Sequence, residues 1–381
     1  MMQKCLDGFH TNFNDYETML GYHESQSKDS VWHRMAINKL QVAPLDKASP
    51  LYGTLTKFAS HITTDAIYDT ADNLGLAVKL EKHYYPVRDT AFKSLTDRAK
   101  ISGSALPKLN KSDLARVLNA CLKLHKTNVL LLIRDEKISA AHSGDEKDYS
   151  VLEINKLLES ISDKLTERFP GHIFDSGYTD HSLTSASWSL PNQRDELLGA
   201  YKKVLDAQGK STMAAKIMPG IRFCTSDTGM ASAKTAALLL GLKYPIHIGG
   251  MLAVEHREQA KIEDFTKNLD LMFAKFGNAV AQLEKLTTIY LNYPVNAMTA
   301  VCKKLSITPK KAVMEAIAMF EGSLGNSGVT AHDIFMAMQE IIFILRTEGV
   351  PEGKLLITEE NLARALTLRW SEYDYAKAVS Y

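Results

Sequence analysis

The chain has 381 residues, of which 45 are Lys or Arg and 44 are Asp or Glu, so its formal net charge is +1. A chain of this length has room for two or three domains, or for one large α+β body with an appended helical part. Because the charges balance, the total charge argues neither for nor against a nucleic-acid partner, and only local patches carry an electrostatic argument.

Cysteine spacing and apolar runs indicate the cell compartment. Cys5, Cys121, Cys224 and Cys302 lie far apart without a CxxC pair, which argues against a zinc knuckle or a disulfide framework and favours a reducing compartment. The longest apolar runs, such as NVLLLI, are much shorter than the roughly 20 residues that cross a bilayer, and no signal peptide is expected. We therefore expect a cytoplasmic protein without a membrane partner.

The first half of the chain mixes strands and helices. Residues 1–40 combine Asn, His, Asp, Ser and aromatics without a period, and a loose or partner-dependent arm is expected there. LAVKLEKHYYPV (76–87) is typical of a strand, and helices are predicted over 88–103 and 112–126. NVLLLIRD and KISAAHS then predict a hairpin that turns at Asp135-Glu136.

The pattern becomes helical towards the C-terminus. A helix is predicted over 150–169, strands over 172–190, a helix over 193–210, and a strand (IRFC, 221–224) followed by a polar turn and a helix (MASAKTAALLL, 230–240). After a strand at YPIHIGG, a long helix from about 257 to 291 opens a helical region. The sequence thus predicts an α+β fold with a loose arm (1–40), an α+β core (41–256) and a helical C-terminal third (257–381).

The polar turn at residues 225–230 contains the tripeptide Asp227-Thr228-Gly229. This is also the tripeptide of aspartic proteases, but their chemistry needs two carboxylates that share a proton, and the chain has one copy. A helix N-terminus binds anions through its N–H groups, so a phosphate near Thr228 to Met230 is one interpretation. The other is that Thr225, Ser226 or Asp227 caps the helix, and we expect this structural role for Asp227.

Other polar clusters lack the spacing of a catalytic or metal site. FDSGYTDHSLTSASWS contains Asp175, Asp180, His181 and several serines, but no GxSxG, and hydroxyls that alternate on a sheet surface explain it. His247 and His256 do not form an HExxH pair. We expect no catalytic residue, no cofactor and no metal, and hence a protein that is not an enzyme.

Local charge is uneven along the chain. Nine basic residues and three acidic ones lie between Arg88 and Lys126, seven and three lie between Lys210 and Lys261, and five and nine follow from Glu321 onward. One interpretation is a set of ordinary solvated helix faces. The other is a basic face that binds phosphates, and it predicts nucleic-acid contacts at Arg88, Lys93, Arg98, Lys100, Lys108, Lys111, Arg116, Lys123, Lys126, Arg222 and Lys234.

An ordered series of segments resembles a known family. The series is YYPVRDTAFKSL, ISGSALPKL, NVLLLIRDEKISAAHSGDEKDYSVLEINKLLE, DHSLTSASWSLP, PGIRFCTSDTGMASA and the closing LRWSEYDYAKAVSY. It is similar to the phage- and plasmid-borne family catalogued as domain of unknown function 932, in which a strand and a short polar turn precede a helix. That family has no established activity, so the resemblance implies an origin on a mobile element.

These observations lead to three hypotheses of function. The first is an accessory protein of phage or plasmid replication or recombination that binds nucleic acid, single-stranded DNA above all. The second is a protein-interaction module that binds a host protein and inhibits a host defence system. The third is an enzyme that acts on a phosphorylated substrate at the turn over 225–234. Assembly into a homo-oligomer stays open.

Overall fold

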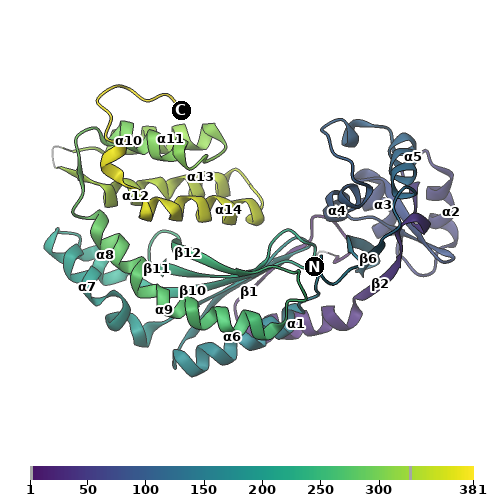
Figure 1. The fold of residues 1–381 in the computed structure, drawn as a ribbon, viewed down its shortest axis with the longest axis horizontal. Coiled ribbons are helices and arrows are strands. Elements are labelled where there is room, and N and C mark those ends of the chain that lie inside the picture. Colours follow the sequence, from purple (N-terminus) through teal and green to yellow (C-terminus); the bar gives the residue numbers. More distant parts are fainter. Residues whose placement is uncertain (1–2, 326–327) are drawn as a thin grey trace.

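The structure is a computed structural model and describes residues 3–325 and 328–381. Three lobes follow one another around a curved body (Figure 1). We call them the hairpin lobe (31–143), the sheet lobe (10–29 and 150–286) and the helical lobe (290–381). The sheet lobe lies between the other two, so residues from distant parts of the sequence meet at its two borders.

A six-stranded antiparallel sheet forms the sheet lobe, in the order β1-β8-β9-β10-β11-β12. In β9, Ala186 and Trp188 pack into an apolar core with the helices, whereas Ser185 and Ser187 alternate with them. This alternation places successive side chains of a strand on opposite faces of the sheet. The strands are β1 (His10–Phe13), β8 (Ile173–Asp180), β9 (Thr184–Ser189), β10 (Met218–Thr225), β11 (Ala233–Leu240) and β12 (Ile246–Val254), and the helices are α1 (Tyr16–Asp29), α6 (Ile154–Arg168), α7 (Arg194–Ala207), α8 (Ser211–Lys216) and α9 (Ile262–Leu286).

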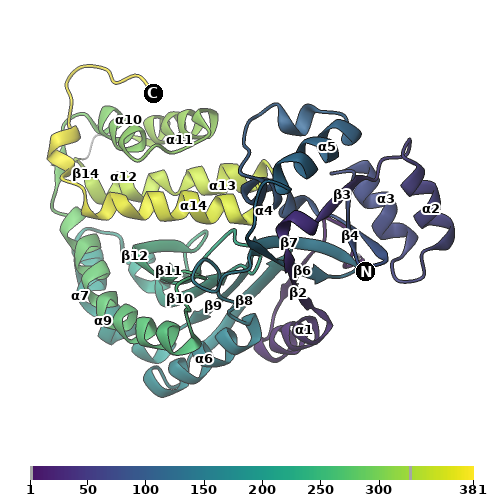
Figure 2. The ribbon, with the colours of Figure 1, turned by 45° about the vertical axis from the view of Figure 1, so that its right-hand side comes forward.

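The hairpin lobe contains two three-stranded sheets and four helices. Its predicted hairpin is confirmed, since β6 and β7 pair and the turn residues Asp135 and Glu136 have φ of 48° and 68°, as a two-residue turn of this kind requires. Its strands are β2 (Val31–Ala36), β3 (Gln41–Pro44), β4 (Leu76–Leu80), β5 (His83–Pro86), β6 (Asn128–Arg134) and β7 (Lys137–Ser143), and its helices are α2 (Pro50–Phe58), α3 (Thr64–Asp72), α4 (Asp89–Ala99) and α5 (Lys111–Leu122). In Figure 2, α4 lies nearer the sheet lobe and α2 farther from it.

The helical lobe packs on the opposite side of the sheet from α9. Phe265 of α9 contacts Phe223 on one face of β10, while Glu359 pairs with Arg222 on the other. The lobe consists of β13 (Tyr290–Leu291), α10 (Pro294–Lys304), α11 (Lys310–Ser323), β14 (Val329–Thr330), α12 (Ala331–Met338), α13 (Glu340–Thr347) and α14 (Glu352–Ala363). The predicted α+β class with a helical C-terminal region is confirmed.

Three details of the sequence prediction are corrected. The N-terminal segment is not a loose arm, because β1 pairs with β8 and the apolar Met19 of α1 is buried in the sheet core. Residues 233–240 form β11 instead of a helix, since their backbone pairs with both β10 and β12. The long helix covers Ile262–Leu286 and packs on β11 and β12, so the core crosses the expected boundary at residue 256.

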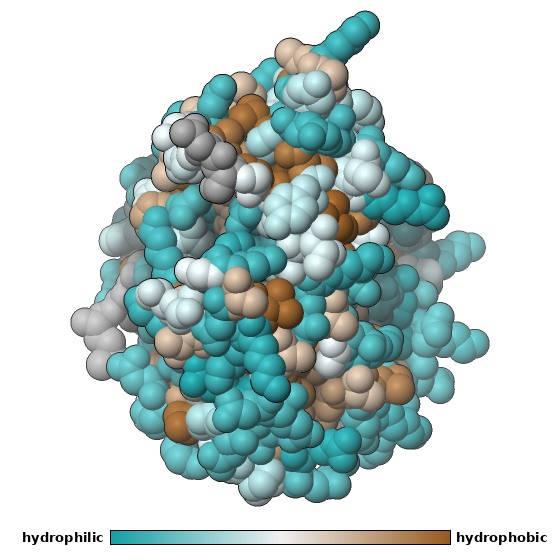
Figure 3. All heavy atoms as spheres, turned by 90° about the vertical axis from the view of Figure 1, so that its left-hand side faces the viewer, coloured by the Kyte–Doolittle hydropathy of each residue, from teal (hydrophilic) through white to brown (hydrophobic). Residues whose placement is uncertain are grey.

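The surface on the side of the molecule that carries α7 and α8 is mainly hydrophilic. Figure 3 shows this face, on which hydrophobic side chains gather in the upper part, over the helical lobe. Within the described residues, no helix combines the length and the apolar character that crossing a membrane requires.

Candidate functional site

Buried charges concentrate at the border between the hairpin lobe and the sheet lobe. Arg88 and Lys137 are fully buried, and Arg134 is 9% exposed. Arg134 ends β6, Lys137 begins β7 and Arg88 is the N-cap residue of α4. A buried charge is costly unless it is paired and hydrogen-bonded, so each cation needs an acidic partner nearby.

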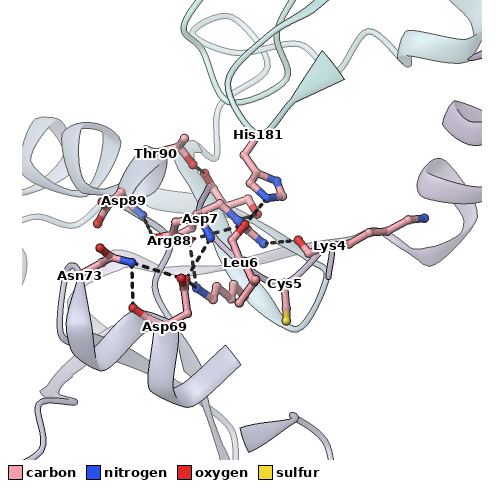
Figure 4. Close-up of polar contacts among 12 residues, drawn as sticks. Lys4, Cys5, Leu6, Asp7, Asp69, Asn73, Arg88, Asp89, Thr90 and His181 are labelled. Atoms are coloured by element: carbon pink, nitrogen blue, oxygen red, sulfur yellow. Dashed lines mark hydrogen bonds and ion pairs between the residues drawn. The ribbon is translucent and has the colours of Figure 1, made fainter. Parts of the chain in front are cut away.

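The first group of charges holds the N-terminal segment against the hairpin lobe (Figure 4). The ammonium of Lys137 contacts both Asp69 and Asp7, 3.0 Å from Oδ1 of Asp7. The guanidinium of Arg88 lies 3.4 Å from the same oxygen, and donates to the carbonyl oxygen of Leu6 at 3.2 Å and to the hydroxyl of Ser139. Two cations and two carboxylates therefore balance one another, and the segment around Leu6 is fixed.

The second group of charges holds the loop between β10 and β11. The carboxylate of Asp227 accepts a hydrogen bond from Nη2 of Arg134, whose Nε donates to the hydroxyl of Ser30 at 2.8 Å. The carbonyl oxygen of Asp227 accepts from the hydroxyl of Tyr149 at 2.9 Å and lies 2.8 Å from Nε2 of His142. Both ends of Asp227 are thus bonded to the hairpin lobe or to residues that follow it.

The loop does not cap a helix, which corrects the expected role of Asp227. The hydroxyl of Ser226 accepts from the N–H groups of Thr228 and Met230, each at 3.3 Å, and Gly229 has φ of +79°. The sequence predicts a cap or an anion at these N–H groups because it predicts a helix after them, but the strand β11 follows instead. Without a helix there is no N-terminal dipole to attract an anion, and the Asp227 side chain serves Arg134 instead.

Burial governs the ionisation of this site. Burial acts to raise the pKa of the Asp227 carboxyl, but the charge and hydrogen bond of Arg134 outweigh it and hold that pKa below its usual value. Burial also lowers the pKa of His23 and of His142, each to about 4. Both imidazoles are therefore neutral at pH 7, with one donor and one acceptor nitrogen each.

Four rings lie against one another beside the Asp227 loop. His142 and Tyr149 stack with their centroids 3.6 Å apart and their planes at 4°, and Tyr149 is nearly parallel to His256 at 5.7 Å. Trp32 of β2 lies 6.0 Å from His142. Because packed rings restrict the motion of their neighbours, these rings support the Asp227 loop and limit the orientations of the Trp32 side chain.

A cavity of about 260 Å³ opens where α1, β2 and the Asp227 loop meet. Its polar walls come from His23, Gln26, Arg134 and Asp227, and Trp32 forms another wall. Side chains of these types donate and accept hydrogen bonds and stack on flat groups. Within the described residues, no cluster of side chains has the composition of a metal site.

Six of the residues predicted to contact nucleic acid are already engaged. Arg88 and Arg222 are wrong as contacts, since Arg88 is fully buried and Arg222 pairs with the buried Glu359. Four others form bonds at or near the surface: Lys93 with Asp97, Arg116 with Asp113, Lys234 with Glu360, and Lys111 with the carbonyl oxygen of Asn73.

The other five predicted residues are Arg98, Lys100, Lys108, Lys123 and Lys126, and the described parts of the chain show no ion pair for any of them. Four of them lie at one end of the hairpin lobe, near the C-terminal ends of α4 and α5. These two helix ends lie together, because Nε2 of His125, which follows α5, is 3.4 Å from the carbonyl oxygen of Ala99, the last residue of α4. We call Arg98, Lys100, Lys123 and Lys126 the basic end. Lys108 lies apart, in the 3-10 turn Leu106–Lys108.

The sequence interpretation missed Arg134, Lys137, His23 and Trp32. One signal was present, because Arg134 and Lys137 flank a turn between two apolar strands, and charges at the ends of buried strands need partners. Nothing in the spacing of His23 or Trp32 distinguishes them from core residues.

Comparison of the chain with known protein families, with curated proteins and with solved structures finds no significant match.

Proposed function

We propose that the protein binds single-stranded nucleic acid through the basic end, as an accessory of phage or plasmid replication or recombination. The observation that carries the proposal is the gathering of Arg98, Lys100, Lys123 and Lys126 where the C-terminal ends of α4 and α5 meet. Unpaired cations on one surface attract the phosphate backbone irrespective of base sequence. Binding alone is proposed for this surface.

The neighbouring surface limits where a strand lies. Lys126 borders a hollow whose other residues include Asp145, Glu146 and Asp148 in the loop after β7. Together with Lys126, Arg34 and Lys147 in the same hollow balance these carboxylates, so the hollow offers no net positive charge and the strand is expected to follow the helix ends. Four cations correspond to about four phosphate contacts, which gives a salt slope of about −3 for a single strand.

The origin and the compartment rest on other support. The ordered segments that resemble domain of unknown function 932 favour a mobile element as the source. All four cysteines are free thiols, which suits the reducing cytoplasm of a bacterial host. Cytoplasmic location is thus part of the proposal.

The test is a fluorescence-anisotropy titration of a labelled single-stranded oligonucleotide at about 50 mM and about 200 mM salt. We expect micromolar or weaker affinity that falls with salt. The triple variant Lys100→Glu, Lys123→Glu, Lys126→Glu should weaken binding at least about tenfold at the lower salt, because it reverses three of the four proposed contacts.

The matched control changes the net charge equally but elsewhere. Lys203, Lys275 and Lys304 are exposed residues of α7, α9 and α10, and their replacement by Glu should leave the affinity within a few-fold. Equal losses in both triple variants would show that only net charge matters. Binding that ignores salt and both sets of changes would contradict the proposal.

A further inference from the structure

The cavity beside Asp227 contains a buried side chain without a partner. His23 of α1 is 2% exposed, and within the described chain neither of its ring nitrogens has a hydrogen-bond partner. His23 is one of the residues that line the cavity. Leaving a buried polar group unpaired is unfavourable, so such a group at the wall of a cavity is suited to hydrogen-bond a ligand there.

The charges of the cavity wall select against ions. Asp227 and Arg134 neutralise each other, and Glu153 at the rim is engaged with Ser27 and Lys156. An anionic ligand would meet two carboxylates, and a cationic one would meet the guanidinium. A charged ligand would lose its water in the cavity without gaining a compensating charge, which is unfavourable. A neutral ligand with both hydrogen-bond donors and acceptors avoids this cost.

Several groups in the wall offer hydrogen bonds to a neutral ligand. His23 supplies one donor and one acceptor, and Gln26 has an amide. The hydrogen bonds of Arg134 described above use two of its five N–H donors. Donors and acceptors side by side match the edge of an amide, a lactam or a nucleobase.

The remaining walls favour a flat ring. Trp32 lines the cavity and contacts His142 and Tyr149, and Val151, Leu152 and Ile154 add apolar surface to the lining. The volume of about 260 Å³ lies just below the range of about 300–1,000 Å³ that holds drug-sized molecules, and so suits a one- or two-ring compound. An aromatic wall adds stacking to any flat ligand.

We propose that this cavity binds a neutral heterocycle of nucleobase size, which stacks on Trp32 and forms hydrogen bonds with His23 and the Arg134–Asp227 pair. The ring is either a base of a bound single strand or a free nucleoside. The first source rests on the proposed function, whereas the second is independent of it.

Trp32 provides the readout. The other tryptophans, Trp188 and Trp370, are 1% and 0% exposed, so a ligand in the cavity alters mainly the emission of Trp32. The full chain is titrated with uridine, cytidine, adenosine and guanosine, with calorimetry alongside. At least one nucleoside should bind, and His23→Leu should weaken it at least about tenfold through the lost hydrogen bond.

Two further variants separate binding from folding. His247 is also buried with two unpartnered ring nitrogens but does not line this cavity, so His247→Leu should leave nucleoside affinity unchanged. Val151 is 38% exposed at the cavity wall, and Val151→Trp should block the cavity without disturbing a buried charge.

A strand with bases and the same strand made abasic distinguish the two sources. Tighter binding of the strand with bases, lost in Val151→Trp, assigns the cavity to a base of the strand. Nucleoside binding with equal affinity for both strands assigns it to a free nucleoside. If no nucleoside binds and the strands bind equally, the cavity proposal fails, while salt-dependent binding of the abasic strand would leave the proposed function standing.

Discussion

The border between the hairpin lobe and the sheet lobe differs sharply from the basic end of the hairpin lobe. At the border, Arg88, Arg134 and Lys137 are buried and each contacts a carboxylate. At the basic end, Arg98, Lys100, Lys123 and Lys126 lie outside any ion pair of the described residues and near the C-terminal ends of two helices. Side chains of the same chemical type thus hold two lobes together in one place and lie outside the described ion pairs in the other.

The difference follows from the cost of desolvation. A buried cation is tolerated only beside a carboxylate that compensates its charge. Removing either partner therefore leaves the other charge uncompensated in a medium of low polarity. An exposed cation keeps its water and contributes little to folding, typically less than about 1 kcal/mol. Stability therefore depends on the border, and the proposed binding of a nucleic-acid strand depends on the basic end.

Acid should destabilise the border between the hairpin lobe and the sheet lobe before it affects the basic end. The pKa of His23 and that of His142 are each lowered to about 4, first by burial, against about 6.5 in an unfolded chain. Their contribution is complete above about pH 6.5 and is lost as the pH falls towards 4, by up to about 1.4 kcal/mol per pH unit for each histidine. Urea unfolding at several pH values measures this slope.

The slope has its own control. His23→Leu should flatten it by the share of one histidine, since leucine does not titrate. An unchanged slope in a folded His23→Leu variant would show that His23 is not kept neutral in the native state.

Substitution of Asp227 should destabilise the border strongly. Asp227→Asn removes the charge that compensates the buried Arg134, and the expected loss in free energy of unfolding is about 3–5 kcal/mol. Urea denaturation at pH 7 measures it. The exposed pair of Arg116 and Asp113 is the control, where Asp113→Asn should cost less than about 1 kcal/mol. Similar losses in the two variants would contradict the contrast between the regions.

Charge reversal at the basic end should have the smallest effect on stability. Lys100 and Lys123 occupy the C-cap positions of α4 and α5, where a negative charge opposes the helix dipole by about 0.3–1 kcal/mol each. Lys100→Glu and Lys123→Glu should therefore lower the melting temperature only slightly while weakening strand binding. Extensive unfolding of these variants would mean that the basic end is structural.

Local patterns in the sequence predicted several elements because the interactions that form them are local. The apolar residues of α6 recur at helical spacing, and the turn at Asp135-Glu136 separates two apolar runs, so both could be recognised. The stretch AKTAALLL was misassigned because Ala and Leu favour helices. Its place between β10 and β12 overrides that preference.

Charge counting does not distinguish the cations that the tertiary structure buries from those that it leaves at the surface. Arg88 and Arg98 lie ten residues apart in one basic stretch, yet the first is buried against Asp7 and the second belongs to the basic end. No local pattern separates them. The cavity likewise depends on α1, β2 and the loop after β10 coming together.

By itself, the sequence determined the α+β class, the helical C-terminal region, the β6–β7 hairpin and a basic stretch around α4 and α5, because propensity, periodicity and charge are properties of neighbouring residues. The tertiary structure alone decided that His10 pairs with Asp180, that Asp7 meets Arg88 and that Asp227 meets Arg134. Each of these contacts joins residues that are distant in the sequence. It is favourable only because the fold takes both partners out of water, so that each backbone group or charge needs the other.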